Sequence, residues 1–293
     1  MKLGILVEAE EGLDWDGWRR VYATAERLGF ESVWISDHFL SPWAAERHGL
    51  DAWVALAVAA AETSRVMLGP LVSPITFREP AMVARMAESL HDLSQGRFVI
   101  GLGLGWNEAE HAQAGIAFPP VAERQRRLEE GIRLIRRNLG ERRVPLLIGG
   151  GGPRATLPLV ARYADHWNMT TSSVEVYRAR SERLAGLCTA AGRDPAQIRH
   201  SVAVGCLVGR NAAELGARCE RMRTIVPPLA EAADVPEAVR RMGWVVGTPR
   251  EVAEQLDALA QAGIDLAMLG HYDLSDERVL ELIASEVMPA VAS

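Results

Sequence analysis

A glycine-rich turn follows a short apolar segment within residues 94–111, SQGRFVIGLGLGWNEAEH. The β-branched pair Val99 and Ile100 is typical of a strand. The glycines after it are Gly101, Gly103 and Gly105. Their missing side chains leave room for a flat ligand or a second backbone segment, and barrel enzymes hold their active sites at the carboxyl ends of strands. The pattern predicts a ligand-binding turn with Trp106 at its rim.

A second glycine run comes after the apolar segment that ends at Ile148. Its members are Gly149, Gly150, Gly151 and Gly152. Arg154 then leads into a helical pattern that runs on through Leu157 and Val160. Unpaired backbone amides and the positive end of a helix dipole together favour a bound anion. A tight turn without a ligand is the alternative, but a bound group would offset the backbone entropy that four glycines cost. The run therefore predicts a phosphate-binding loop.

An acid and a histidine end the apolar segment at residues 32–36. Because a histidine can exchange a proton near neutral pH, His38 is a candidate catalytic residue, with Asp37 as the group that orients its ring. A turn-capping role for Asp37 is the alternative. Trp43 and Trp53 follow in the same loop and helix start, and a tryptophan there is as consistent with a core as with a cofactor site.

Several common catalytic motifs do not fit the chain. The glycine spacing GxGxG differs from the GxGxxG order of dinucleotide-binding folds, and neither a GxSxG elbow nor an HExxH helix occurs. Glu108 and His111 have the ExxH spacing that di-iron bundles use, but we predict no metal site. With these motifs excluded, the sequence predicts a binding cleft that contains glycines, tryptophans and the pair Asp37 and His38.

The composition is that of a globular protein, with 48% hydrophobic and 24% charged residues in a chain of 293. A net charge of −6 argues against a nucleic-acid partner, because phosphate neutralisation needs a clustered basic face. No apolar run approaches the roughly 20 residues of a membrane span, and the start of the chain lacks the pattern of a secretory signal. We therefore expect a cytoplasmic protein with no membrane partner, whose three cysteines are reduced.

Strand-like and helix-like segments alternate along the whole chain. The strand candidates are residues 3–7, 32–36, 66–72, 98–102, 145–148, 166–169, 201–208 and 266–269. Apolar residues at helical spacing lie between them, and Thr248, Pro249 and Glu251 form a helix-start signal. The alternation predicts one parallel (β/α)8 barrel over residues 1–293, with a doubly wound open sheet as the alternative. Residues 211–243 interrupt it as a helical insertion, either a lid on the active face or a pair packed outside the barrel.

Six stretches in this order resemble the luciferase-like flavin-dependent oxidoreductases, in particular the branch that uses the deazaflavin coenzyme F420. They are AERLGFESVWISDHF at 25–39, the long stretch at 68–111, FPPVAER at 118–124, LIGGGG at 147–152, ARYADHWN at 161–168 and VGTPREVAEQLDALAQAGID at 246–265. The resemblance covers nearly the full chain. It implies a (β/α)8 TIM barrel of the bacterial luciferase-like type, with a flavin at the carboxyl face and a homodimeric assembly.

The resemblance also implies residue roles. His38 would lie beside the reactive edge of the ring, Trp43 would line the substrate pocket, and Gly149–Gly152 with Arg154 would hold the phosphate. Leu71, Val72 and Ser73 match the place where these proteins carry a non-proline cis peptide behind the flavin, and Gly103, Gly105 and Trp106 belong to the same cofactor site. The implied activity is hydride transfer between F420 and a small organic substrate.

Two departures from the family pattern qualify this picture. Sugar-phosphate dehydrogenases of the group carry a glutamate directly after the GxGxG turn, where this chain has Trp106, and the segment between Leu139 and Pro145 is shorter than usual. A monooxygenase that receives reduced FMN from a partner reductase is the alternative function. A flavin carrier without activity is a third.

Overall fold

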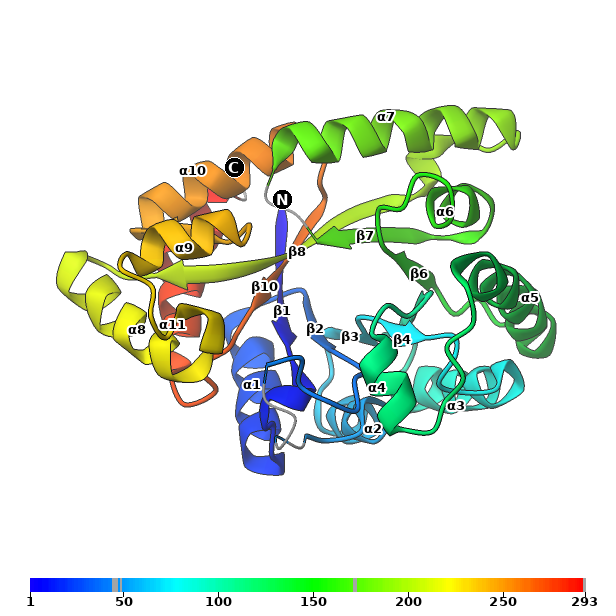
Figure 1. Cartoon of the computed structure of the whole chain (residues 1–293), viewed down its shortest axis with the longest axis horizontal. Coiled ribbons are helices and arrows are strands. Elements are labelled where there is room, and N and C mark those ends of the chain that lie inside the picture. The colour runs from blue at the N-terminus through cyan, green and yellow to red at the C-terminus, as the bar shows by residue number, and fades with distance from the viewer. Residues whose placement is uncertain (44–46, 48, 171–172, 292–293) are drawn as a thin grey trace.

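The predicted apolar segments form one parallel sheet that curves into a barrel (Figure 1). The computed structural model describes residues 1–43, 47, 49–170 and 173–291. The strands are β1 (Lys2–Val7), β2 (Ser32–Ile35), β3 (Met67–Pro70), β4 (Ser73–Pro74), β5 (Ile100–Gly103), β6 (Leu146–Gly149), β7 (His166–Thr170), β8 (Arg199–Val208), β9 (Val245–Gly247) and β10 (Leu266–Gly270). All eight predicted segments contain a strand, so the barrel is confirmed. Strands β4 and β9 were not among them, because two or three residues are too few to show strand periodicity.

The barrel closes between β3 and the segment that leads into β5. Neighbouring strands follow the order β3-β2-β1-β10-β8-β7-β6-β5-β4, and β9 pairs with β8. The amide of Val99 donates to the carbonyl of Leu68 over 2.8 Å, and the amide of Leu68 donates to the carbonyl of Arg97 over 3.1 Å. Because the strands run parallel, their carboxyl ends meet at one rim, where the site residues predicted from the sequence gather.

Helices cover the outside of the barrel with the apolar stripes that the sequence predicts (Figure 1). The described helices, of which α4, α8 and α9 lie at the rim, are α1 (Trp15–Leu28), α2 (Ala52–Glu62), α3 (Pro80–Leu93), α4 (Glu108–Gln113), α5 (Val121–Leu139), α6 (Leu157–Tyr163), α7 (Val174–Ala190), α8 (Ala212–Ile225), α9 (Val235–Arg241), α10 (Pro249–Gln261), α11 (Glu277–Leu282) and α12 (Met288–Val291). Thr248 and Glu251 form the predicted capping box at the start of α10. Within the described residues, no helix is both long and apolar enough to cross a membrane.

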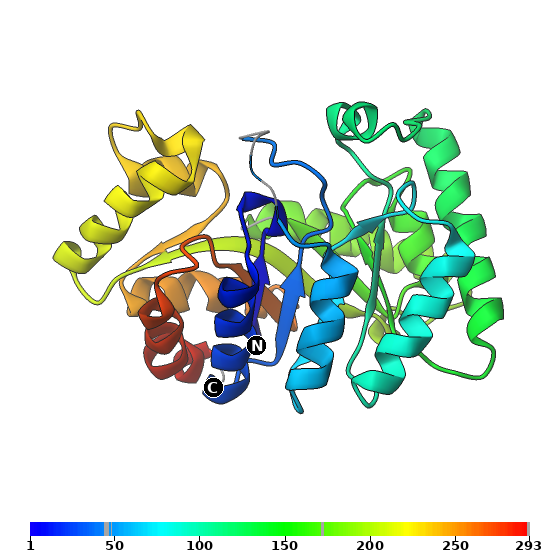
Figure 2. The same ribbon diagram turned by 90° about the horizontal axis from the view of Figure 1, so that it is seen from below.

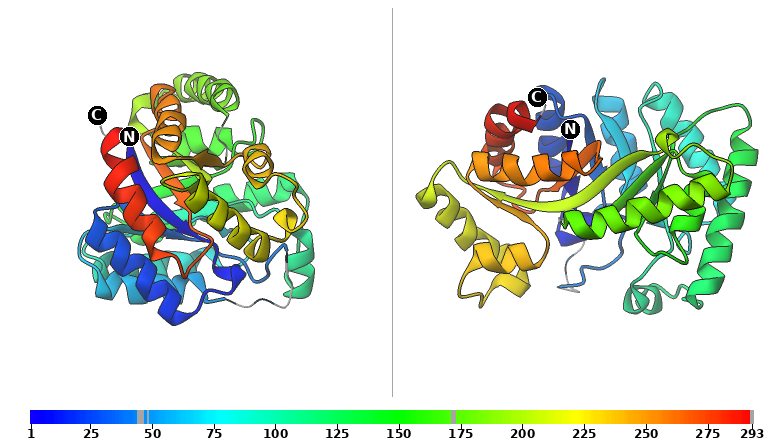
Figure 3. Two further views of the ribbon diagram at one scale, coloured as in Figure 1. Left: turned by 90° about the vertical axis from the view of Figure 1, so that its left-hand side faces the viewer. Right: turned by 90° about the horizontal axis from the view of Figure 1, so that it is seen from above.

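A separate apolar cluster fills the inside of the barrel. Its buried members include Leu6, Trp34, Leu147 and Met268, which come from different strands, and Val99, which directly precedes β5. Side chains of alternate strand residues point inward, so this packed layer supports whatever lies at the rim above it. The long strand β8 crosses the molecule from beside α7 to α8 (Figure 3).

Residues 211–243 hold α8, a short 3-10 turn at Pro227–Leu229, and α9. These helices pack around a small core of their own, with Met222, Val226 and Val239 against Trp244. They rise on the side of the sheet that also carries α4 and the loop after β2 (Figure 2). The insertion therefore flanks the rim where the strands end.

Candidate active site

A cavity of about 460 Å3 opens at the carboxyl ends of the strands. This size is ordinary for a small-molecule or cofactor site, which spans roughly 300–1,000 Å3. The residues that line it are Leu6, Glu8, Glu10, Glu11, His38, Pro42, Trp43, Leu71, Val72, Pro74, Gly103, Leu104, Gly105, Trp106, Gly149, Gly150, Thr156, Asn168, Thr170, Ala203, Val204, Gly205, Met242, Gly243, Trp244, Gly270 and Tyr272. The structure thus brings His38, Trp43 and both glycine-rich turns to one place.

Val72 forms part of the cavity floor, and glycines make room for it. The peptide bond between Leu71 and Val72 is cis, as the family resemblance implies. A Cβ atom on Gly103 would lie 2.6 Å from Val72 Cγ2, and one on Gly149 would lie 2.9 Å from Val72 Cγ1. A Cβ on Gly101 would lie 1.9 Å from the carbonyl oxygen of Pro70. The glycines therefore accept a second segment of this chain, one of the two uses that the sequence suggests.

The four-glycine run reaches the cavity with its first half. Gly149 and Gly150 line the cavity, and Gly150 has a φ of +115°, a conformation that favours glycine. The amide of Gly150 donates to the carbonyl of Asn168 over 2.8 Å. In the part of the chain that the structure describes, the amides of Gly151 and Gly152 have no hydrogen-bond acceptor.

The predicted helix entry needs correction, and Arg154 lies outside the cavity lining, so its role in binding the cofactor stays a prediction. Helix α6 begins only at Leu157, after a turn over residues 153–156, and it is seven residues long. Arg154 is exposed and does not line the cavity. Thr156 lines the cavity instead, because the turn folds back over the glycines and brings its hydroxyl there.

His38 is oriented by Glu110, a residue that the sequence does not single out. Nδ1 of His38 lies 3.0 Å from Oε2 of Glu110, whose side chain is 1% exposed. The amide of Phe39 donates to the same carboxylate over 2.5 Å. Asn107 caps the helix α4 that carries Glu110, because its side chain accepts a hydrogen bond from the Glu110 amide. The ring of Trp106 meets the His38 ring edge to face at 5.7 Å.

Electrostatics keeps a proton on His38. Burial disfavours the imidazolium, but the hydrogen bond with Glu110 and the charges of Glu10, Glu110 and Glu8 outweigh burial and raise the pKa of His38 from 6.5 to about 9. Burial and the charge of Glu10 raise the pKa of Glu8 to about 8. Glu10, which accepts a hydrogen bond from the Ser36 hydroxyl, also has a raised pKa because it is buried. In the sequence, the acidic residues directly after the first strand are the feature that points to this cluster of carboxyl groups.

Asp37 does not orient His38, so that prediction is wrong. Its carboxylate accepts hydrogen bonds from the Ser73 hydroxyl and from Arg78, each over 2.5 Å. Trp53 donates to the same hydroxyl over 2.8 Å, and Asp51 pairs with Arg78 at 2.8 Å. Neighbouring residues of an extended segment point to opposite sides, so Asp37 faces the loop after β3 while His38 faces the cavity. Asp37 and Ser73 hold that loop and do not line the cavity.

Besides Trp106, three aromatic side chains line the same cavity. The ring of Trp244 stacks on the ring of Tyr272 at 4.6 Å and 9°. Trp43, predicted to line the pocket, lies 6.1 Å from Tyr272. His111 lies outside the cavity lining, where its ring is bonded to Thr76 and to the Asn107 carbonyl.

Known proteins that are similar to this chain include enzymes that depend on F420 or on FMNH(2). A family model described as luciferase-like monooxygenase matches residues 1–266. The F420-dependent glucose-6-phosphate dehydrogenase of Kineococcus radiotolerans is 30% identical, over 90% of each chain. The FMNH(2)-dependent dimethylsulfone monooxygenase of Pseudomonas fluorescens is 24% identical, over 98% of this chain and 90% of the relative. The structure of an F420-dependent secondary alcohol dehydrogenase with an F420-acetone adduct superposes with a TM-score of 0.79 at 21% identity, covering 99% and 98% of the two chains.

Proposed function

The chain belongs to the luciferase-like monooxygenase family and is an oxidoreductase, and from this premise we propose that it transfers a hydride between coenzyme F420 and a small organic substrate. The observation that carries the proposal is the cavity that joins the Val72 floor, the Gly149 turn and His38. The full-length similarity to an F420-dependent dehydrogenase supports F420 as the cofactor.

The residues of the cavity fit a flat ring with an anionic tail. Leu71 and Val72 offer an apolar surface on which a ring can lie, and Gly103 and Gly149 carry no side chain beside it. The free amides at Gly151 and Gly152, with the Thr156 hydroxyl, suit the phosphate of the tail. When bound, F420 supplies a hydride donor or acceptor.

The protein manages the proton that accompanies the hydride. Because Nδ1 of His38 donates to Glu110, Nε2 is the ring nitrogen left to exchange a proton with a substrate. The imidazolium holds its proton at neutral pH, so when a hydride adds to the carbon of a substrate carbonyl, the oxygen of that carbonyl would take its proton from His38. Glu110 keeps the ring in position for this transfer.

Cofactor choice is the decisive test. F420 and FMN are titrated side by side into the purified protein, and we expect F420 to bind more tightly. His38→Asn should leave F420 affinity nearly unchanged and lower turnover by about 100-fold or more, the usual contribution of a general acid. His91→Asn, outside the cavity lining, serves as the matched control and should retain turnover.

The monooxygenase relative makes reduced FMN the second candidate cofactor. Tighter binding of FMN than of F420, together with oxygen-dependent turnover, would replace the proposed function with that alternative. Binding of neither cofactor would overturn both.

A further inference from the structure

Trp43, Trp244 and Tyr272 form an aromatic shelf at one end of the cavity. Trp244 and Tyr272 are parallel within 9°, with ring centroids 4.6 Å apart, and Trp43 leans against Tyr272. All three side chains line the cavity. None of them is needed for the proton transfer assigned to His38, so the shelf requires a separate explanation.

Two paired glycines make the aromatic shelf possible. Gly205 of β8 and Gly270 of β10 are register partners in the barrel wall. A Cβ on Gly205 would lie 2.2 Å from Trp244 Cδ2, and a Cβ on Gly270 would lie 2.8 Å from Tyr272 Cε2. Real Cβ atoms do not approach so closely, so any other residue at either position would lift a ring off the wall. The rings thus lie directly on the strand backbone.

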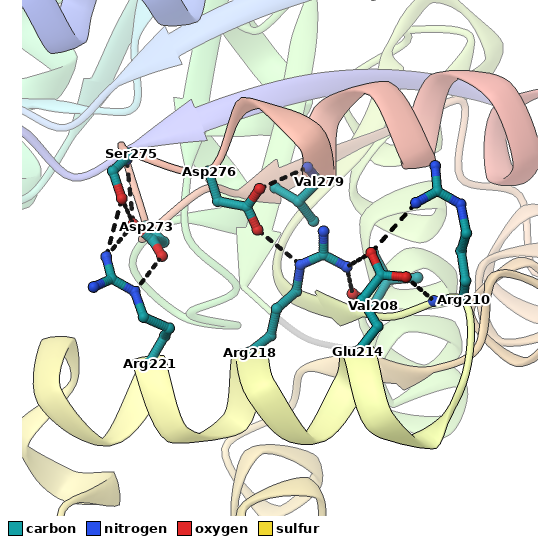
Figure 4. A network of polar contacts seen from close by, with 9 residues as sticks. All are labelled: Val208, Arg210, Glu214, Arg218, Arg221, Asp273, Ser275, Asp276 and Val279. Carbon is teal, nitrogen blue, oxygen red and sulfur yellow. Dashed lines mark hydrogen bonds and ion pairs between the residues drawn. The ribbon is translucent and has the colours of Figure 1, made fainter.

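Ion pairs tie α8 of the helical insertion to the segment that directly follows Tyr272 of the aromatic shelf (Figure 4). The carboxylate of Asp273, next to Tyr272, accepts two hydrogen bonds of 2.9 Å from Arg221 of α8. Arg218, one turn earlier on the same helix, donates to Asp276 over 2.8 Å and to the Val208 carbonyl over 2.8 Å. Trp244 is packed in the apolar core of the insertion. A surface fixed from both sides is preorganised for binding.

Within the described residues, the lining around the aromatic shelf offers an anion no free cation. Glu8, Glu10 and Glu11 line the same cavity. Among the described residues of the lining, His38 is the only one with a basic side chain, and it is already paired with Glu110. Glu11 is already paired with Arg47, and burial raises the pKa of both Glu8 and Glu10, so these acids are not what excludes an anion. A phosphate or carboxylate beside the shelf would lose its hydration without gaining a cation, which costs binding energy.

We propose that the aromatic shelf is the substrate subsite and that it takes an uncharged organic molecule with a flat ring, while phosphorylated and carboxylated analogues are rejected. This inference rests on the proposed function, because it assigns the rest of the cavity to the cofactor. Ring stacking contributes about 0.5–1.5 kcal/mol beyond buried area, which corresponds to roughly 2- to 12-fold in affinity.

Matched naphthyl compounds test the inference by calorimetry on the full chain saturated with reduced F420, with which an alcohol cannot react. We expect 1-(2-naphthyl)ethanol to bind at least about 10-fold more tightly than 2-naphthyl phosphate or 2-naphthoate. Trp244→Leu and Tyr272→Leu should each weaken the alcohol by about 2- to 12-fold and leave F420 affinity unchanged. Trp15→Leu, on α1 and outside the cavity lining, is the matched control and should change neither affinity.

A further variant tests whether the position of the rings matters for affinity, apart from the apolar area that the rings provide. Arg221→Met keeps every ring but removes both hydrogen bonds to Asp273, and Arg221 is 55% exposed, so the fold should survive. We expect a smaller loss of naphthylethanol affinity, about 2- to 3-fold, with F420 affinity retained.

The outcomes distinguish this inference from the proposed function. If wild-type protein binds F420 but the alcohol and the phosphate bind equally well, or Trp244→Leu weakens F420 instead of the alcohol, the subsite is overturned and the function stands. If wild-type protein does not bind F420, the proposed function fails. The same titrations without cofactor then decide whether the shelf still prefers the uncharged ring.

Discussion

Nδ1 of His38 lies 3.0 Å from the carboxylate of Glu110, a residue 72 positions away in the sequence. The two side chains come from the loop after β2 and from the first turn of α4. With Glu110 almost fully buried and His38 15% exposed, the pair is shielded from water, and its electrostatic coupling is therefore strong. This contact sets both the orientation and the protonation of the candidate catalytic histidine.

Replacing Glu110 with glutamine should lower the pKa of His38 by about one unit or more. The amide keeps a similar shape but removes a negative charge within hydrogen-bond distance of the ring. An NMR titration of the His38 ring protons measures the change directly. We also expect turnover above pH 7 to fall, since less imidazolium would be present. A His38 pKa that stays near 9 in this variant would show that Glu110 does not set it.

Replacing Asp37 with asparagine should leave the titration of His38 nearly unchanged and reduce the free energy of unfolding by on the order of 2 kcal/mol. The carboxylate is buried against Ser73 and Arg78, so its loss weakens charge-assisted hydrogen bonds of the loop after β3. Urea denaturation measures the loss. Asp51→Asn is the control, because that side chain is 47% exposed and should cost less than about 1 kcal/mol. A large shift of the His38 pKa in Asp37→Asn would instead restore the orienting role that the sequence suggests.

Stability should decline as pH rises through the slightly alkaline range. The pKa of His38 is higher in the folded chain, about 9 against 6.5, so its contribution is fully present below pH 6.5 and is lost as pH approaches 9. Glu8 acts in the same direction between pH 4.5 and about 8, because the folded chain binds its proton more tightly than the unfolded chain. Urea unfolding at pH 6, 7, 8 and 9 checks this.

The variant Glu8→Gln separates the two contributions. It removes the part of the pH dependence that belongs to Glu8 and leaves a shallower decline from His38. A wild-type free energy of unfolding that stays constant or rises over this range would refute both assignments.

Replacing Gly103 with alanine should cost about 1–3 kcal/mol of stability, because the new methyl group would lie 2.6 Å from Val72 Cγ2. Val72→Ala removes that Cγ atom, so the double variant should recover part of the loss. A double-mutant cycle measured by urea unfolding gives the coupling energy. Gly186→Ala is the control: the position is an exposed site in α7 with nothing within 4 Å, and the substitution should stabilise the helix by roughly 1 kcal/mol. Additive effects of Gly103→Ala and Val72→Ala would mean that the two residues do not compete for space.

Local features of the sequence predict the barrel correctly because they record which side of each element is buried. Apolar residues recur at helical spacing within the helices, and β-branched residues gather in the strands. These patterns depend only on residues that are close together in the chain. The capping box at Thr248 and Glu251 is equally local, since the side chains and the backbone amides that they bind are three residues apart. The first two glycines of the 149–152 run also reach the cavity, because a strand end places them there.

Which side chains contact each other across the rim depends on the closed barrel. Residues 38 and 110, or 244 and 272, meet because separate loops converge where parallel strands end, and no periodicity in the chain encodes which side chains then touch. The same closure turned Asp37 toward Arg78 instead of His38 and placed Arg154 outside the cavity lining. The amino-acid sequence by itself thus determined the fold and the rim that carries the site. The partners within the site followed from the tertiary structure, because they depend on how distant loops are brought together in space.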